Sequence, residues 1–313
     1  MRRQVVRSVA VRAVAAVAVV GALLSGCGTG PSQVGAAVIV GDRAVPESEV
    51  QARLDEALAR TAIRDELAAQ GVQTADIARD IVTQAVLHEL TTRAASAEGI
   101  VVTPPEIEAE LEELGGLQAV EEQSLFPAEV VRERLGDQLV AERLAAEQVN
   151  GLAVTVDILG VDSQREAEDA VQVLAEGGPA ADKLFADNPE TSRRGFEYRA
   201  SVNPDVAVSA VFGTPVGGSG YFQPVPGQDD WVVYRVLSRR TDAPAVAPEL
   251  DVVPQIGDSG LAEIGIRLLQ PYADQAGVRV NPRYGVWDPV TMRVLDEDDV
   301  AGAVLPPRAP SVS

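Results

Sequence analysis

The chain of 313 residues contains a single cysteine, Cys27, and this one residue restricts how the fold can be stabilised. A lone thiol cannot form an internal disulfide, so the folded state must depend on packed apolar surface. The residues ahead of Cys27 are first charged and then apolar, with four arginines before an uncharged run at residues 13–24. This order is typical of a secretory signal, and the apolar run is too short to span a bilayer stably. The sequence therefore predicts a protein that leaves the cytoplasm.

Residues 24–27, Leu-Ser-Gly-Cys, resemble the bacterial lipobox, in which an aliphatic residue and two small residues precede a cysteine. The resemblance implies that residues 1–26 are a signal peptide that is removed and that the thiol of Cys27 carries an acyl chain such as palmitate. Residues 27–35 would then be a short tether to the extracytoplasmic face of the cell membrane. An ordinary cleaved signal, or an uncleaved anchor with a buried cysteine, are the alternatives.

Charge and histidine content exclude several classes of function. The formal net charge is −21, and it becomes −25 when the four arginines of the signal are removed, so we expect no nucleic-acid partner. The only histidine, His88, rules out a multi-histidine metal site and argues against a Ser-His-Asp triad. We expect His88 to be structural, at the edge of a helix's apolar stripe. Acidic clusters such as residues 108–113 lack calcium-loop spacing. The sequence thus predicts no cofactor and no metal.

Apolar periodicity predicts a hairpin and four helices in residues 36–151. The hairpin joins two β-prone segments, residues 36–40 and 44–45, through a Gly-Asp-Arg turn. The clearest helix start is at residues 103–106, where a Thr/Glu capping box accompanies proline at the first helical position. Apolar stripes and caps place the helices at residues 46–70, 74–97, 103–114 and from residue 126 onward.

The periodicity changes near Asn150, which predicts a second domain over residues 152–240. An apolar run at residues 153–161 predicts a strand, and residues 163–176 have the spacing of a helix. Residues 231–236 are β-branched or aromatic almost throughout and give the strongest strand signal in the chain. We expect a loop from Pro189 to Pro204 and a turn at the glycine-rich residues 217–220.

The last part of the chain predicts a linker, one helix, a strand and a tail. Three prolines in residues 241–257 favour an extended linker, and Asp258 is a candidate cap for a helix that ends at Gly277. The strand that follows leads into residues 281–289, which hold a tyrosine and a tryptophan. This segment is either a recognition edge or, as we favour, the strand that closes the N-terminal domain against its hairpin, with Trp287 in the core. Residues 290–313 are acidic and proline-rich and predict a mostly disordered tail.

This order of elements resembles the SurA and PrsA type of extracytoplasmic foldase. In such proteins a C-terminal helix completes an N-terminal helical chaperone domain after an intervening parvulin domain. The resemblance implies an α+β fold in which residues 36–151 and 258–289 form one domain and residues 152–240 are a parvulin-like insert. It is carried by residues 40–50, 156–159, 177–178, 184–185, 210–212, 215–217 and 231–236.

The sequence departs from this family at the isomerase site. Parvulins of this kind have a histidine just before Ile-Leu on the first strand and another on the last strand. Asp157 stands at the first position and Val232 at the second, and residues 151–313 contain no histidine. A valine side chain cannot form a hydrogen bond, and a carboxylate there would need solvent or a partner. We therefore predict that the insert is a degenerate parvulin domain without a catalytic site.

These observations predict a lipid-anchored extracytoplasmic chaperone whose partners are unfolded or exported polypeptides, held in a groove between the helical and inserted domains. One alternative is a prolyl isomerase with a non-standard site, for which peptide isomerisation would be lost on Asp157→Ala. Another is a non-catalytic envelope scaffold, which would not suppress aggregation of a denatured protein.

Overall fold

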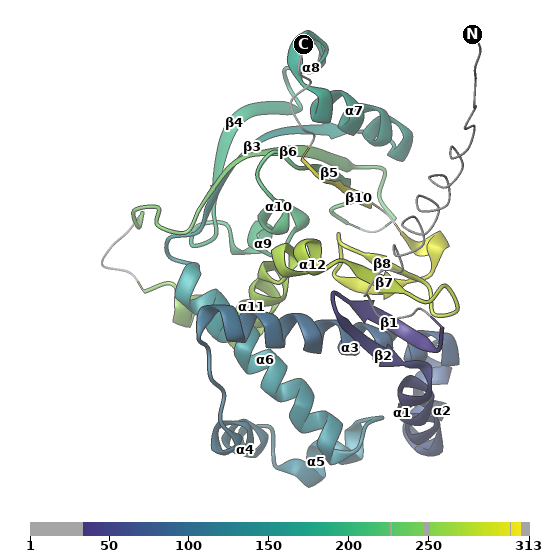
Figure 1. Ribbon diagram of the computed structural model, residues 1–313. Helices are drawn as coiled ribbons and strands as arrows, with labels where there is room; N and C mark the ends of the chain where they lie inside the picture. Colours follow the sequence, from purple (N-terminus) through teal and green to yellow (C-terminus); the bar gives the residue numbers. More distant parts are fainter. Residues whose placement is uncertain (1–33, 226, 247–250, 301, 308–313) are drawn as a thin grey trace, which may run out of the picture. The chain divides into compact units, whose positions relative to one another are not determined.

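The computed structural model describes residues 34–225, 227–246, 251–300 and 302–307, and Figure 1 shows the arrangement of their helices and strands. The α+β fold that the sequence predicts is confirmed, with sheets of the order β2-β1-β7, β10-β5-β6-β3-β4 and β8-β9. Cys27, the predicted signal and most of the predicted tether lie outside the described residues.

The three-stranded sheet joins the two ends of the described chain. β1 (Ala36–Val40) pairs antiparallel with β2 (Arg43–Pro46) and, on its other edge, with β7 (Val278–Val280). All five β1 residues are buried, which explains why this strand is apolar throughout. The predicted pairing of hairpin and C-terminal strand is therefore present for β7. It does not extend to β8 (Val286–Asp288), which pairs instead with β9 (Arg293–Leu295).

The N-terminal helices follow the predicted pattern with two differences. The first predicted helix is divided into α1 and α2, because the backbone of Arg60 leaves helical geometry (φ −81°, ψ 70°). The short helix α5 was not predicted. The capping box at Thr103 is present, with the Thr103 amide donating to Glu106 Oε2 at 2.7 Å. The helices are α1 (Glu47–Ala59), α2 (Thr61–Ala69), α3 (Thr74–Glu98), α4 (Pro104–Glu113), α5 (Leu117–Gln123) and α6 (Ala128–Gln148).

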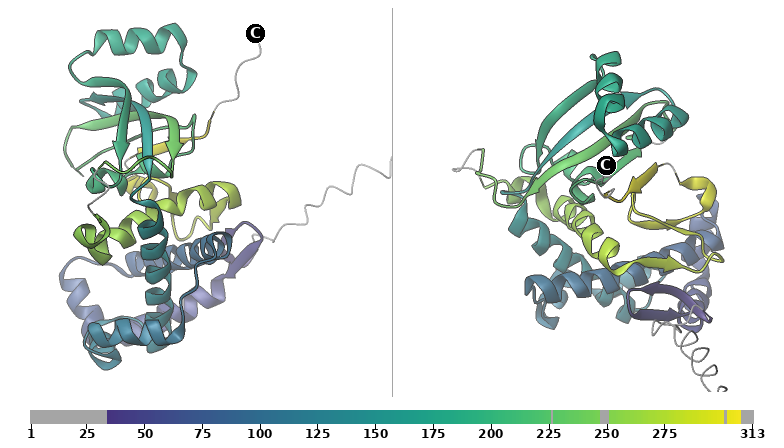
Figure 2. Two further views of the ribbon diagram at one scale, coloured as in Figure 1. Left: turned by 90° about the vertical axis from the view of Figure 1, so that its left-hand side faces the viewer. Right: turned by 45° about the horizontal axis from the view of Figure 1, so that its top comes forward.

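The middle of the chain forms an antiparallel sheet with helices on both faces, as Figures 1 and 2 show. Two predictions about it are wrong. The expected loop at Pro189–Pro204 contains β4, which was not predicted because its sequence is charged and its pairing partner, β3, lies far along the chain. The expected glycine turn includes the start of β5. The elements are β3 (Ala153–Val161), α7 (Gln164–Glu176), α8 (Gly178–Asp187), β4 (Ser192–Arg199), α9 (Pro204–Ala207), α10 (Ala210–Gly213), β5 (Ser219–Phe222) and β6 (Trp231–Arg240).

The two faces of this sheet have separate apolar surroundings. Leu159 and Val233 pack with α7 and α8 on one face. Tyr234 and Phe212 are fully buried on the other face, within the cluster that also contains residues of β1, α3, α6 and α11. The helical part and the sheet therefore share one core across the second face.

The chain enters and leaves the middle segment at one place. The amide of Ala243 donates to the carbonyl of Gly151 at 2.9 Å, and a Cβ on Gly151 would lie 2.2 Å from the Thr241 carbonyl oxygen. Adjacent ends are what an inserted domain requires. On this basis we retain residues 152–240 as a proposed inserted domain.

The C-terminal elements divide the predicted last helix and correct the prediction for the tail. α11 (Val253–Leu268) is interrupted at Gly257 (φ +72°), so a short helical turn with Pro254 near its start precedes the continuous helix, which begins at Asp258 as the sequence predicts. α12 (Gln270–Ala276) follows directly. The predicted disordered tail is wrong for residues 290–307, where β9, a 3₁₀ turn (Glu297–Asp299) and β10 (Gly302–Leu305) form. The reason is again non-local, since β10 pairs with β5.

Arg267, on α11, ties three segments together from a buried position with 5% of its surface exposed. Its Nε donates to the Val208 carbonyl at 3.0 Å, and its Nη1 donates to the Pro289 carbonyl at 2.9 Å and to Gln270 Oε1 at 3.0 Å. Its Nη2 donates to the carbonyl of Val290. Burial lowers the pKa of this guanidinium to about 10. One side chain thus links α11 to the segment before α10 and to the C-terminal strands.

Candidate functional site

Asp157, the first position aligned with a parvulin histidine, is a buried side chain with local partners. Its Oδ1 accepts the amide of Gly195 at 2.9 Å, and its Oδ2 lies 3.6 Å from Arg194. Gly195 falls where the register between β3 and β4 shifts, so the carboxylate satisfies an amide at that irregularity. Arg194 also pairs with Asp182 of α8 at 2.6 Å. These contacts give Asp157 a structural role at the sheet edge.

Val232, the second aligned position, lies on the opposite face of the sheet. Asp157 pairs with Arg235 and Gly160 pairs with Val232, and the register between these pairs is continuous. Residues three apart on a strand point to opposite faces. Val232 therefore shares the face of Tyr234, whereas Asp157 lies on the side covered by α7 and α8. The structure does not bring the two positions together, so this pair cannot form a common site.

An apolar groove lies between three helices of the helical part. α3, α6 and α11 enclose a cavity of about 380 Å³. Its apolar lining comes from Leu87, Ala141, Ala262 and Ile266, and its polar residues include Gln84, Gln138 and Glu263. Ala141 and Ala262 are small, which leaves open space between the helices that larger side chains would fill. The remaining lining residues are Thr91, Arg134, Asp137 and Ser259, so the apolar side chains form one stretch within a mixed lining. That stretch suits an apolar side chain of a bound peptide.

His88 and Asp137 form an ion pair beside this groove, with Asp137 in its lining. His88 Nδ1 lies 3.1 Å from both carboxylate oxygens of Asp137. The hydrogen bond to Asp137 raises the pKa of His88 above its ordinary value, against the effect of burial. Burial raises the pKa of Asp137, and the bond to His88 opposes that shift. His88 thus joins α3 to α6, and its partner is Asp137 and not the adjacent Glu89.

The junction between the helical part and the sheet contains a second cavity, of about 530 Å³. The Tyr272 hydroxyl donates to Glu98 Oε1 there at 2.6 Å, and burial together with Glu98 raises the pKa of Tyr272. Arg239 lines the same cavity, and burial lowers the pKa of its guanidinium. The lining is mostly polar: Glu98, Glu147, Gln148, Arg239, Thr241, Leu268, Pro271, Tyr272 and Gln275. The apolar groove therefore lies among the helices and not at this junction, where the sequence reasoning placed it.

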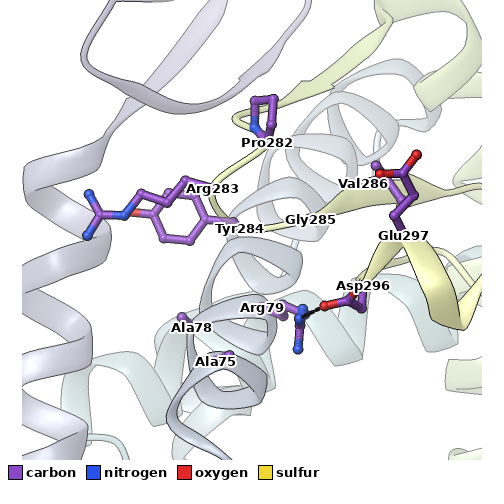
Figure 3. A pocket seen from close by; sticks show the side chains of 10 residues that line it. All are labelled: Ala75, Ala78, Arg79, Pro282, Arg283, Tyr284, Gly285, Val286, Asp296 and Glu297. Atoms are coloured by element: carbon purple, nitrogen blue, oxygen red, sulfur yellow. Dashed lines mark hydrogen bonds and ion pairs between the residues drawn. The ribbon is translucent and has the colours of Figure 1, made fainter.

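The aromatic segment at residues 281–289 lines a third cavity, of about 230 Å³, shown in Figure 3. Arg79 of α3 pairs there with Asp296, and Arg283 lies over the ring of Tyr284 at 5.6 Å. Tyr284 is buried, and Trp287 is half-buried against the main core. Both aromatic residues thus take part in packing, but the strand that contains Trp287 pairs with β9 and not with the hairpin, so the expected closure of the N-terminal domain by this segment is wrong.

Comparison with known proteins places the first part of the chain in a family. Residues 1–138 match the family model of the SurA-like N-terminal domain. This chain carries a SurA-like N-terminal domain. The SurA resemblance predicted from the hairpin and helices is confirmed for this part. It includes α3 and six of the eleven groove-lining residues, from Gln84 to Gln138. A solved structure, the foldase protein PrsA from Lactococcus lactis, matches at 11% identity and a TM-score of 0.29, covering 79% of this chain and 95% of that chain. No curated protein matches.

Neither a metal-ligand cluster nor a membrane-spanning helix is found among the residues that the structure describes. Over residues 34–307, apart from the undescribed positions, no three acidic, histidine or cysteine side chains gather as a metal would require. Within the same described part of the chain, no helix has the length and apolar character to cross a membrane. The groove residues Leu87, Ala141, Ala262 and Ile266 were missed from sequence, because helical spacing shows which face is apolar and not which helices leave a gap.

Proposed function

We propose that this protein is an extracytoplasmic chaperone that holds unfolded, exported polypeptides, and that Cys27 anchors it to the membrane by a lipid. The SurA-like domain supports the chaperone class. The observation that carries the proposal is the apolar groove between α3, α6 and α11, which offers sequence-tolerant contact to an apolar side chain.

The geometry of the groove is suited to weak binding of many different unfolded polypeptides. Leu87 and Ile266 are only half-buried in the folded chain, so each retains apolar surface that a bound side chain can cover. The charged residues of the groove are of both signs, Arg134 with Asp137 and Glu263, so the lining does not favour one sign of charge on a partner. Binding of many unfolded chains follows from such a site, because apolar contact depends little on the partner's sequence.

Aggregation of a denatured protein tests this function. Wild-type protein should suppress light scattering, and the groove variants Leu87→Gln and Ile266→Gln should need at least threefold more protein for the same effect. Leu237→Gln is the matched control, since Leu237 is 41% exposed on β6 and away from the groove. Circular dichroism would show that all variants are folded. Wild-type protein that leaves scattering unchanged would favour an envelope scaffold.

We also propose that the inserted domain works without prolyl isomerase activity. Asp157 is engaged by Gly195 and Arg194, and Val232 lies on the other face of the sheet. A short proline peptide should isomerise at its uncatalysed rate in the presence of the protein. A rate above this background that disappears in Asp157→Ala would reverse the proposal.

A further inference from the structure

β10 differs in origin from the other strands of its sheet. β5, β6, β3 and β4 all come from residues 153–240, and these four form a continuous sheet among themselves. β10 comes from the end of the described chain and adds a fifth strand outside β5, as Figure 1 shows. The middle sheet thus has an edge at β5 that is occupied by a distant segment of the same chain.

The β5 edge is shaped for close approach of a strand. A Cβ on Gly220 would lie 2.5 Å from the Tyr234 hydroxyl of β6 and 2.8 Å from the Ala303 carbonyl oxygen of β10. One on Gly218, just before β5, would lie 2.8 Å from the Thr214 side chain and 3.2 Å from the Leu305 carbonyl oxygen. On the other side, a Cβ on Gly302 would lie 2.5 Å from the Tyr221 carbonyl oxygen. A larger residue at Gly302 would push the two backbones apart, and one at Gly220 would clash with both Tyr234 and the β10 backbone. The edge therefore accepts a strand that begins with glycine and continues with small or aliphatic residues.

β10 is held there by few interactions. It has four residues, and the side chains of Ala303, Val304 and Leu305 are only half-buried. No side chain from residue 302 to 307 carries a hydrogen-bonding group, so the strand depends on its backbone ladder and on partial apolar contact. The nearest preceding side-chain anchor is Asp296, which pairs with Arg79. Pro306 and Pro307 lack amide donors and end the ladder.

We propose that the β5 edge is a binding site for extended apolar segments of exported polypeptides, and that β10 is a tethered competitor that occupies it when no such segment is present. The chemistry of the resident strand identifies the partner: Gly-Ala-Val-Leu offers a backbone ladder and aliphatic side chains, with nothing charged to recognise. Unfolded exported chains contain many such segments. This inference rests on the proposed chaperone function and names a second place where the partner binds.

A peptide probe tests whether the edge accepts a strand in trans. In the full mature chain with Cys27→Ala, deletion of residues 302–313 should raise the affinity for a fluorescein-labelled Gly-Ala-Val-Leu-Pro-Pro peptide at least tenfold, measured by anisotropy. The control peptide Gly-Pro-Pro-Leu-Pro-Pro lacks ladder donors and should not bind. A folded deletion variant without this gain overturns the proposal, and so does a deletion variant whose sheet no longer folds, since β10 would then be an integral strand.

A reversible disulfide gives an independent measurement without removing β10. Leu305 and Ser219 are cross-strand partners, and a pair of cysteines at directly opposed positions is close enough to form a disulfide. In the Leu305→Cys/Ser219→Cys variant, oxidation should lower peptide affinity at least tenfold, and reduction should restore it. Each single-cysteine variant is the control. Equal peptide affinity in the two redox states would overturn the proposal.

The same variant separates this inference from the chaperone function. If oxidised and reduced forms bind the peptide equally but both suppress aggregation, the edge site fails and the chaperone function stands. If no form suppresses aggregation but reduction restores peptide binding, the chaperone function fails and the strand site stands. A concentration-dependent dimer in sedimentation that is lost with residues 302–313 would assign the edge to a second copy's tail and overturn the exported-polypeptide assignment.

Discussion

Gly265 is the point at which α11 and α6 approach most closely, and Gly265→Ala should separate them. A Cβ built on Gly265 would lie 1.9 Å from the carbonyl oxygen of Ala141 and 2.3 Å from its carbonyl carbon. These are backbone atoms, so no side-chain rotation can relieve the overlap. To reach ordinary contact the two helices must move apart by about 1.5 Å.

The cost follows from the side chains that flank this contact. Leu261 and Leu268 lie four residues before and three residues after Gly265, on the same helix face, and both are buried. Burying each contributes about 1.5–3 kcal/mol. A gap of about 1 Å already forfeits up to a half of the contact energy, so the wider gap here costs about 1.5–3 kcal/mol for the pair. Strain from overpacking adds about 1–3 kcal/mol to this loss. The higher helix propensity of alanine relative to glycine offsets about 1 kcal/mol. The expected loss of stability is about 3 kcal/mol.

Urea unfolding followed by far-ultraviolet circular dichroism measures this loss. Gly136→Ala is the matched control: it is also a glycine within a helix, on the partner α6, and its added Cβ would meet only the flexible end of Ile107 at 3.3 Å. That variant should gain up to about 1 kcal/mol. A Gly265→Ala protein within about 1 kcal/mol of wild type would show that the two helices are not held at this distance, and the reasoning would fail.

Three further predictions concern the His88 pair, the buried arginine and the anchor. His88 is the only histidine, so one ring signal in proton NMR should titrate above the ordinary pKa, and its midpoint should move down in Asp137→Asn; an unchanged midpoint would contradict the assignment. Because the folded pKa of His88 is raised, the stabilisation from the pair is lost as the pH rises through that pKa. It is also lost in acid, where the buried Asp137 carboxyl, whose pKa is raised, takes up a proton. Arg267→Met should cost roughly 3 kcal/mol in urea unfolding, because the carbonyls of Val208, Pro289 and Val290 lose their donor, and a loss under about 1 kcal/mol would remove this link. Cys27→Ala should abolish acylation and membrane fractionation, whereas detergent-phase partitioning of a correctly processed variant would end the lipoprotein interpretation.

The parts of the fold that the sequence predicted are those set by local chemistry. The capping box at Thr103 and the hairpin turn after Val40 depend on neighbouring residues, and both are present. β4 and β10 were missed because each exists through a partner far along the chain. The arginines of β4 suit an exposed edge and mask its strand character. The acids and prolines around β10 are typical of disorder, yet its four apolar residues pair with β5.

The candidate sites show the same division. That Asp157 and Val232 point to opposite faces depends on the register of β3 with β6, which no local pattern specifies. The structural role of His88 was predicted from its place on the helix wheel, but its partner Asp137 comes from another helix. The apolar groove arises from how three helices meet. Composition and periodicity predict apolar faces, and the tertiary packing decides which parts of those faces remain open.

The same non-local pairings set an order in which the chain can fold. β3, β4, β5 and β6 lie within residues 153–240, so the middle sheet can form as soon as that segment is available. β1 is different, because Val38 pairs with Val280 near the other end of the described chain, and the intervening loop must close before this contact stabilises anything. The helical part therefore stays incomplete until α11 and β7 arrive. β10 follows both, so the β5 edge is the last strand edge to be covered and stays open to other extended chains for longest.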